Sequence, residues 1–203
     1  LTELENVFSA ADAAAKYGAG SMAHLMVTAA IKAYAYADLS LITVADNKAG
    51  VAAAGKITLS GTANTQGVLR VSIANADTLT IGIGAEDTAA TVAAAVKAAI
   101  DAVPDLPVTA TVAEAVVTLT AKNKGTAGTA IRIKISNTAE GITAAVTAMT
   151  GGDANPDIAA ALNAVVAEGH HIIACGINDE TNLLKLRAHL DTVASPMEKR
   201  WAI

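Results

Sequence analysis

The chain has 203 residues, and its composition is 53% hydrophobic, 2% aromatic and 16% charged, with a formal net charge of −5. The acidic balance, without a basic stripe, excludes electrostatic recruitment of nucleic acid. The single cysteine excludes an internal disulfide and favours a cytosolic origin. No stretch approaches the ~20 uninterrupted apolar residues of a membrane-spanning helix, so no membrane partner is expected.

The N-terminal part reads as two helices followed by a strand. Residues 1–16 have the apolar spacing of an amphipathic helix. After two glycines, Ser21 can cap a second helix that runs to about Ala33. The run 39–44 is nearly continuous in apolar residues, which suits a strand covered on both faces, as in a parallel sheet.

The pattern changes at residue 50 to a period of two, which is typical of β-strands. Segments 69–73 and 79–83 alternate apolar and polar residues and predict a hairpin. One helix follows, capped by Asp87 or Thr88 and ended by Pro104. Further strands are expected at 108–112, 116–120, 131–135 and 142–149.

This middle region contains no aromatic residue, since none occurs between Tyr36 and Trp201. Aromatic side chains are the commonest stacking surfaces for bases, sugars and cofactors. Their absence argues against a cofactor site in the middle of the chain, and no cofactor is predicted.

The helical pattern returns at Asn155-Pro156, an expected cap followed by proline at the first helical position. A buried strand is expected at 171–177. Asp179 can cap a last helix, which carries Leu183, Leu184, Leu186, Leu190 and Val193. The predicted fold is an α/β unit with parallel strands, interrupted by an inserted, mainly β domain with one helix. The expected boundaries are 1–48 with 153–203 for the α/β domain, and 50–151 for the insertion.

His170, His171 and Cys175 are the nearest approach to a metal or nucleophile site. In a strand His171 and Cys175 share one face while His170 takes the other, so three ligands cannot converge without help from elsewhere. Cys175, within an apolar run, is expected to be a small buried side chain with an inert thiol. No metal site and no catalytic residue is predicted.

The sequence GIGAED at 82–87 leads from a strand into a helix, as phosphate-binding turns do. It lacks the third glycine and the Lys-Ser/Thr pair of those turns. Glu86 and Asp87 would also place negative charge where a phosphate should sit, which favours an ordinary turn and cap. Other acids stand at element edges and are expected to serve as caps or to face solvent: Asp38, Asp46, Asp153 and Asp157.

Four segments together resemble the sheath proteins of contractile phage tails, most nearly those of Mu-like phages. They are YGAGSMAHLMVTAAIKAYAYADLSLITVAD at 17–46, VTLTAKNKGTAGTAIRIKI at 117–135, MTGGDANPDIAAALNAV at 149–165 and INDETNLLKLRAHL at 177–190. The resemblance spans essentially the whole chain, and its motifs are structural. Because the sequence begins at Leu1 rather than Met, it is expected to be a fragment of a longer subunit.

The resemblance implies a structural subunit and no enzyme. Such subunits stack as hexameric rings around a tail tube and contract to drive the tube through the host envelope. The implied partners are other sheath subunits, with the tube and baseplate contacted through regions that this sequence lacks. The implied location is the virion tail, after assembly in the host cytoplasm.

Two alternatives remain open at this stage. Threonine-rich β domains without aromatic residues also occur in secreted proteins, so a surface-display or adhesin module is one. The other is an α/β enzyme with an inserted lid, whose ligand would lie beyond the strand ends, near Asp46 and residues 177–179.

Overall fold

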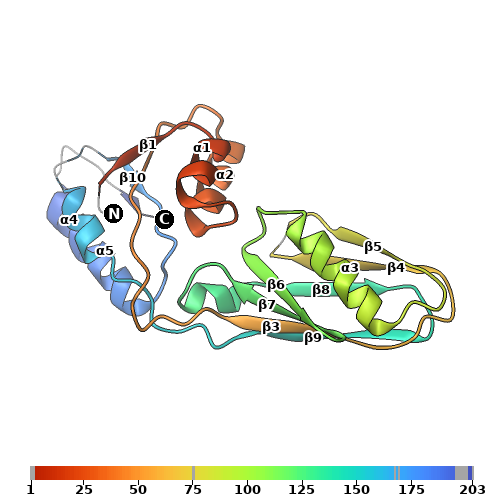
Figure 1. Cartoon of the computed structure of the whole chain (residues 1–203). Coiled ribbons are helices and arrows are strands. Elements are labelled where there is room, and N and C mark those ends of the chain that lie inside the picture. The colour runs from red at the N-terminus through yellow and green to blue at the C-terminus, as the bar shows by residue number, and fades with distance from the viewer. Residues whose placement is uncertain (1–2, 75, 167, 169, 195–200, 203) are drawn as a thin grey trace. The chain divides into compact units, whose positions relative to one another are not determined.

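The computed structural model describes residues 3–74, 76–166, 168, 170–194 and 201–202. The chain divides into two compact units, Leu1–Gly50 with Ala154–Ile203, and Val51–Asp153 (Figure 1). They are called the discontinuous unit and the inserted unit below. In the sequence, the spacing of apolar residues changes between helical and strand-like at 48–50 and again at 151–153.

The first half of the discontinuous unit is a helical pair beside a short β-ribbon. Its elements are β1 (Glu5–Val7), α1 (Ala10–Tyr17), α2 (Met22–Ala33) and β2 (Leu39–Leu41), and β1 pairs with β2 antiparallel. Val7, Ala13 and Val27 form their buried centre. These side chains are small or branched, so the centre of this half is built from small side chains.

The expected helix over 1–16 is wrong at its start, because Glu5–Val7 pair with β2 as strand β1. The helix begins only after Ser9, whose hydroxyl accepts the Asp12 N–H at 3.0 Å. Ser21 caps α2 as expected, accepting the His24 N–H at 3.2 Å. A serine that satisfies an otherwise unpaired N–H of the first turn fixes where each helix begins.

The second half of the discontinuous unit contains α4 (Ala159–Ala164), β10 (Ile172–Ile173), α5 (Glu180–Val193) and β11 (Trp201–Ala202). Its buried centre is Ile158, Leu162 and Leu186, against which Val44, Ile173, Cys175 and Ile177 pack. Val44, from the first half of the discontinuous unit, therefore packs against the core of the second half.

The strands of this unit pair differently from the expectation. β2 pairs with β1, whereas β10 pairs in parallel with β11. In the described residues, no strand pairing joins segment 39–44 to segment 171–177. Each observed strand is only two or three residues long, so half of segment 39–44 and most of segment 171–177 are irregular chain. The α/β unit with a parallel 39–44/171–177 pair stays a prediction.

The inserted unit consists of antiparallel strands and one α-helix. Its elements are β3 (Ala54–Gly61), β4 (Gly67–Ile73), β5 (Leu79–Ile83), α3 (Ala89–Asp101), β6 (Val108–Ala113), β7 (Val116–Ala121), the 3₁₀ helix η1 (Thr126–Ala130), β8 (Ile133–Asn137) and β9 (Ile142–Thr150). The strand orders are β6-β7-β3-β9 in one sheet and β5-β4-β8 in the other. The predicted hairpin is β4 with β5.

Helix α3 lies along both sheets (Figure 1), packing against β5 of one and β3, β6 and β7 of the other. Thr88 caps it, its hydroxyl accepting the Thr91 N–H at 3.3 Å. Its buried stripe of Val92, Val96 and Ile100 follows the helical period, and β3 buries alternate residues. The helical face with a period of 3.6 and the strand face with a period of two, both predicted from sequence, therefore pack into one core.

Among the described residues, no helix is long and apolar enough to cross a membrane.

Candidate functional site

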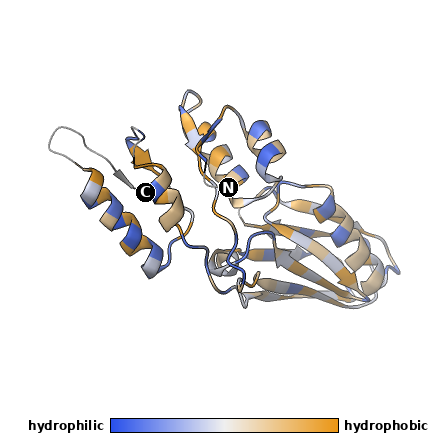
Figure 2. Cartoon of the chain, turned by 60° about the vertical axis from the view of Figure 1, so that its left-hand side comes forward, coloured by the Kyte–Doolittle hydropathy of each residue, from blue (hydrophilic) through white to orange (hydrophobic). Residues whose placement is uncertain are grey.

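The buried face of α5 is largely polar, which is the least expected feature of the chain. Asn182 is 4% exposed and His189 is 8% exposed, with buried Leu186 between them. The spacing of four and three residues places these three side chains on one helical face. Leu183 and Leu184 lie outside this face, because they are 46% and 61% exposed. In Figure 2, α5 is accordingly banded in hydrophilic and hydrophobic colours.

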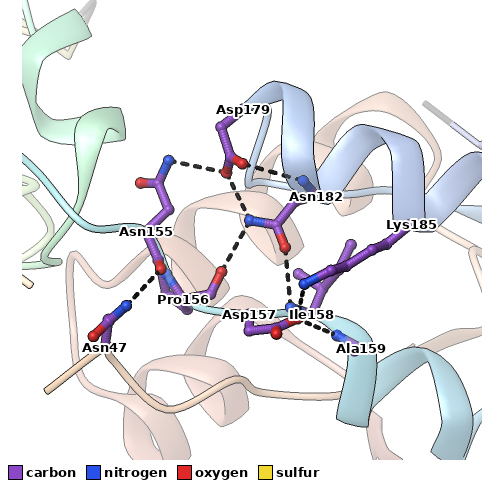
Figure 3. A network of polar contacts seen from close by, with 9 residues as sticks. All are labelled: Asn47, Asn155, Pro156, Asp157, Ile158, Ala159, Asp179, Asn182 and Lys185. Carbon is purple, nitrogen blue, oxygen red and sulfur yellow. Dashed lines mark hydrogen bonds and ion pairs between the residues drawn. The ribbon is translucent and has the colours of Figure 1, made fainter.

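Both polar atoms of the Asn182 side chain make hydrogen bonds (Figure 3). Its Oδ1 accepts the Ile158 N–H at 3.1 Å. Its Nδ2 donates to the Pro156 carbonyl at 3.0 Å and to the Asp179 carboxylate at 2.6 Å. A buried amide with these bonds is stable, whereas one without them would carry a large desolvation cost. Asn182 therefore fixes the segment that leads into α4 against the start of α5.

Asp179 is the N-cap of α5, as the sequence predicts, and it does more than cap. Its carboxylate also accepts the Asn182 backbone N–H at 3.1 Å and the Asn155 side-chain amide at 2.9 Å. The hydrogen bond from the Asn182 side chain, and then the other N–H donors, hold the pKa of the Asp179 carboxyl below its usual range, against a smaller opposing effect of burial.

Asn155 is not the cap of α4, so that expectation is wrong. The helix begins at Ala159, and its N-cap residue, Ile158, makes no side-chain capping bond. The Asp157 carboxylate accepts the Ala159 N–H at 2.9 Å instead, and it binds Lys185 at 2.7 Å. The hydrogen bond from Lys185 and then the Ala159 N–H lower the pKa of the Asp157 carboxyl. The helix therefore begins three residues later than the Asn-Pro pattern predicts, and the Pro156 carbonyl before it accepts a hydrogen bond from Asn182.

Asn47 ties the segment that leaves the discontinuous unit to the segment that returns to it. Its side-chain amide donates to the Asn155 carbonyl at 3.2 Å, and its Oδ1 accepts the Ala49 N–H at 3.0 Å. On the inserted side, Val51 and Asp153 exchange two backbone hydrogen bonds of 3.0 and 3.2 Å. Each unit thus holds its own two ends of the connection side by side.

The candidate metal and nucleophile residues separate in the structure. His171 is exposed, and Cys175 is a partly buried free thiol whose S–H donates to the Ile177 carbonyl at 3.2 Å. His170 faces His189 of α5, with 3.4 Å between their Nε2 atoms. In the part of the chain that the structure describes, no three His, Cys, Asp or Glu residues are grouped to hold a metal.

His189 is the partner that sequence reasoning missed. Its spacing in the sequence could have indicated its burial, because it lies seven residues after Asn182 and three after Leu186, on the same helical face. A polar residue on a buried helical face requires a partner, and the partner is His170, 19 residues earlier in the chain.

The GIGAED segment is a local turn, as the sequence predicts. The Asp87 carboxylate accepts the Gly84 N–H at 2.6 Å, and Thr88 is the residue that caps α3. The Asp87 side chain therefore lies against the backbone N–H of this turn, which in a phosphate-binding loop would face the ligand. Asp38, Asp46 and Asp153 are exposed at element edges.

Exposed large apolar side chains concentrate in the discontinuous unit. All such residues of the described chain except Val51 and Val112 belong to it: Leu4, Phe8, Tyr34, Tyr36, Val166, Ile172, Leu183 and Leu184. Phe8 and Tyr36 are 83% and 86% exposed, and the rings of Tyr34 and Tyr36 meet edge to face with centroids 6.1 Å apart. Because Val7 pairs with Leu39, Phe8 follows the end of β1 at the same end of the ribbon at which Tyr36 precedes β2. We call Phe8, Tyr34 and Tyr36 the aromatic patch.

The polar groups gathered around α5 hold chain segments together, which is the arrangement of a structural module. No family model matches the chain. It is 31% identical over 204 residues to the Mu-like prophage FluMu tail sheath protein of Haemophilus influenzae. The alignment covers 98% of this chain and 40% of that protein, so the chain spans about two fifths of the relative's length. The resemblance to the sheath proteins of Mu-like phages is confirmed by this similarity.

Proposed function

We propose that the chain is a structural part of a phage tail sheath subunit and that it is not an enzyme. The observation that carries this proposal is the 31% identity, which extends over 98% of the chain and therefore over both units. Because the relative is longer, we propose that the chain is one region of a larger subunit. We further propose that the full subunit assembles with other sheath subunits into hexameric rings and contacts the tail tube and the baseplate. Its action would be contraction of the sheath.

The distribution of exposed apolar side chains supports a division of labour between the two units. Protein interfaces are enriched in tyrosine and phenylalanine, and the aromatic patch is exposed on the discontinuous unit. The discontinuous unit would therefore contact neighbouring subunits. The inserted unit has a closed core and few large apolar side chains exposed, which suits a domain presented to solvent.

The enzyme alternative places its ligand near Asp46 and residues 177–179. Asp179 there is engaged by the amides of Asn155 and Asn182. Asp46, the other acid of that location, is exposed. This use of Asp179 as a cap and core anchor supports the structural proposal.

Electron microscopy of the full-length protein that carries this chain tests the proposal. We expect tubular polymers with the diameter of a tail sheath. A matched variant in which a short Gly-Ser linker replaces residues 51–153 should still polymerise, because the proposal assigns the subunit contacts to the discontinuous unit. A monodisperse, non-polymeric full-length protein under all assembly conditions would contradict the sheath proposal. Loss of tubes only in the linker variant would contradict the division of labour.

A further inference from the structure

We propose that His170 and His189 are two ligands of a site for a divalent transition metal such as Zn²⁺, Ni²⁺ or Cu²⁺. This site is separate from sheath function and does not rest on it. Sequence reasoning excluded convergence of the local residues His170, His171 and Cys175 without help from elsewhere. The structure supplies that help from α5, in the form of His189.

The separation of the two imidazoles fits a shared metal ion. Imidazole nitrogens bind zinc at about 2.0–2.1 Å, so two of them on one tetrahedral ion lie about 3.3 Å apart. The Nε2 atoms of His170 and His189 are 3.4 Å apart. Their ring centroids are farther apart, at 5.4 Å, and the ring planes differ by 19°. The Nε2 atoms are therefore closer to each other than the ring centres are, as they are when two imidazoles bind one ion.

The second nitrogen of His170 has the partner that metal-binding histidines usually have. Its Nδ1 lies 3.1 Å from the carbonyl oxygen of Glu168. A hydrogen on Nδ1, donated to that carbonyl, leaves the lone pair on Nε2, the atom that faces His189. Such a bond from the other ring nitrogen orients a ligand histidine and fixes its tautomer.

His189 is held on a rigid support. It lies on the buried face of α5, three residues after Leu186, in a helix whose start is fixed by Asp179. His170 is only partly buried, so water can reach the metal and complete its coordination. Nitrogen ligands favour Zn²⁺, Ni²⁺ and Cu²⁺, whereas Mg²⁺ and Ca²⁺ prefer oxygen ligands. The site should therefore discriminate between these two groups of ions.

In the metal-free protein, the pair is compatible with one shared hydrogen bond. The Nε2–H of His189 can donate to the unprotonated Nε2 of His170. On metal binding, the His189 hydrogen would move from Nε2 to Nδ1, so that both Nε2 lone pairs are available to the ion. Because the described residues offer no third His, Cys, Asp or Glu, we expect reversible binding that a chelator can remove.

Titration of the purified chain with Ni²⁺, Zn²⁺ and Mg²⁺ by calorimetry, and with Cu²⁺ by electron paramagnetic resonance, tests the proposal. We expect one site per chain for the transition metals, none for Mg²⁺, and a Cu²⁺ spectrum with coupling to two imidazole nitrogens. His170→Gln should weaken binding at least tenfold. His189→Gln should do the same where circular dichroism shows that the helix is retained.

His171→Gln and Cys175→Ser are the matched controls, since both residues lie near His170 in sequence. His171 is exposed, and the Cys175 S–H donates to the Ile177 carbonyl. Both controls should bind like the parent chain. The proposal is overturned when the parent chain shows no saturable binding, when His170→Gln binds normally, or when a control loses binding equally. In those cases the His170–His189 pair is a hydrogen bond alone.

Discussion

The side-chain amide of Asn182 donates a 2.6 Å hydrogen bond to the carboxylate of Asp179, the residue that caps the same helix. One carboxylate thereby fixes both the first turn of α5 and the buried amide behind it. Asn182 also bonds the backbone of Ile158 and Pro156. Asn155 donates to Asp179 through its side chain and accepts a bond from Asn47 at its carbonyl. Segments more than 100 residues apart in sequence are therefore held by one connected set of bonds.

Replacing Asn182 with leucine should destabilise the discontinuous unit by about 2–3 kcal/mol, because the Ile158 N–H and the Pro156 carbonyl would be buried without partners. Asn163→Ala, at an exposed position of α4, should change stability by less than about 0.5 kcal/mol. Urea unfolding followed by circular dichroism measures both. Equal stability of the two variants would show that the network contributes little.

The stability of the discontinuous unit should fall at acid pH through Asp179. Its carboxyl has a pKa below the usual range when folded, so the stabilisation is present above the unfolded value of about 3.9 and is lost as pH falls through the folded pKa. Urea midpoints measured from pH 6 down to pH 2.5 should show this loss. Asp179→Asn should have a lower midpoint at pH 6 and a flatter profile.

Asp191→Asn serves as the control for this pH series. Asp191 pairs with exposed Arg187, at 3.8 Å, and exposed pairs contribute little. Its profile should follow that of the parent chain. A parallel shift of the Asp179→Asn and Asp191→Asn profiles would mean that overall charge, and not the Asp179 hydrogen bonds, sets the acid sensitivity.

The inserted unit was predictable from sequence to a greater extent than the discontinuous one. Its strands alternate with a period of two and its helix with a period of 3.6, so local pattern and tertiary core agree in β3 and α3. In the discontinuous unit, the partner of each segment is distant. The sequence around Asn155 does not indicate that its side-chain amide donates to Asp179. The sequence around His170 does not indicate that its ring contacts His189. The leucines of α5 do not by themselves mark its buried face, since Leu183 and Leu184 are exposed whereas Leu186 is buried.

The inserted unit should fold alone as residues 51–153, because its core is closed and its ends are paired through Val51 and Asp153. Leu119→Ala, at a fully buried position, should destabilise it by about 2–5 kcal/mol. Thr118→Ala, the neighbouring and partly exposed residue, is the matched control and should cost much less. Thermal unfolding of the isolated unit measures both, and an unfolded 51–153 fragment would contradict independence. Limited proteolysis of the whole chain should cut near the joints at 48–50 and 151–153.

Cys175 should react slowly with thiol reagents in the folded chain. Its S–H is bonded to the Ile177 carbonyl, and its side chain packs against the second core of the discontinuous unit. Labelling should accelerate strongly in urea, where that packing is lost. The native and unfolded rates, measured by absorbance with an aromatic disulfide, give the comparison. A native rate equal to the unfolded rate would mean that the thiol is accessible.

Assembly should depend on the aromatic patch. In the full-length protein, Phe8→Ser with Tyr36→Ser should abolish or strongly reduce tubes, because exposed aromatic side chains provide much of the binding energy in protein interfaces. Their removal should leave folding intact, since neither side chain is buried. Val112→Ser, an exposed apolar position of the inserted unit, is the matched control and should assemble normally.

The 203 residues alone should be monomeric or weakly associated at micromolar concentration. The aromatic patch provides few anchors, and association must offset the translational and rotational freedom that each subunit loses. Head-to-tail contacts of a helical array also require each subunit to bind several neighbours, and this chain corresponds to 40% of the relative's length. Sedimentation velocity measures the mass directly. Stable rings or tubes from these residues alone would show that the chain itself contains a complete set of subunit contacts.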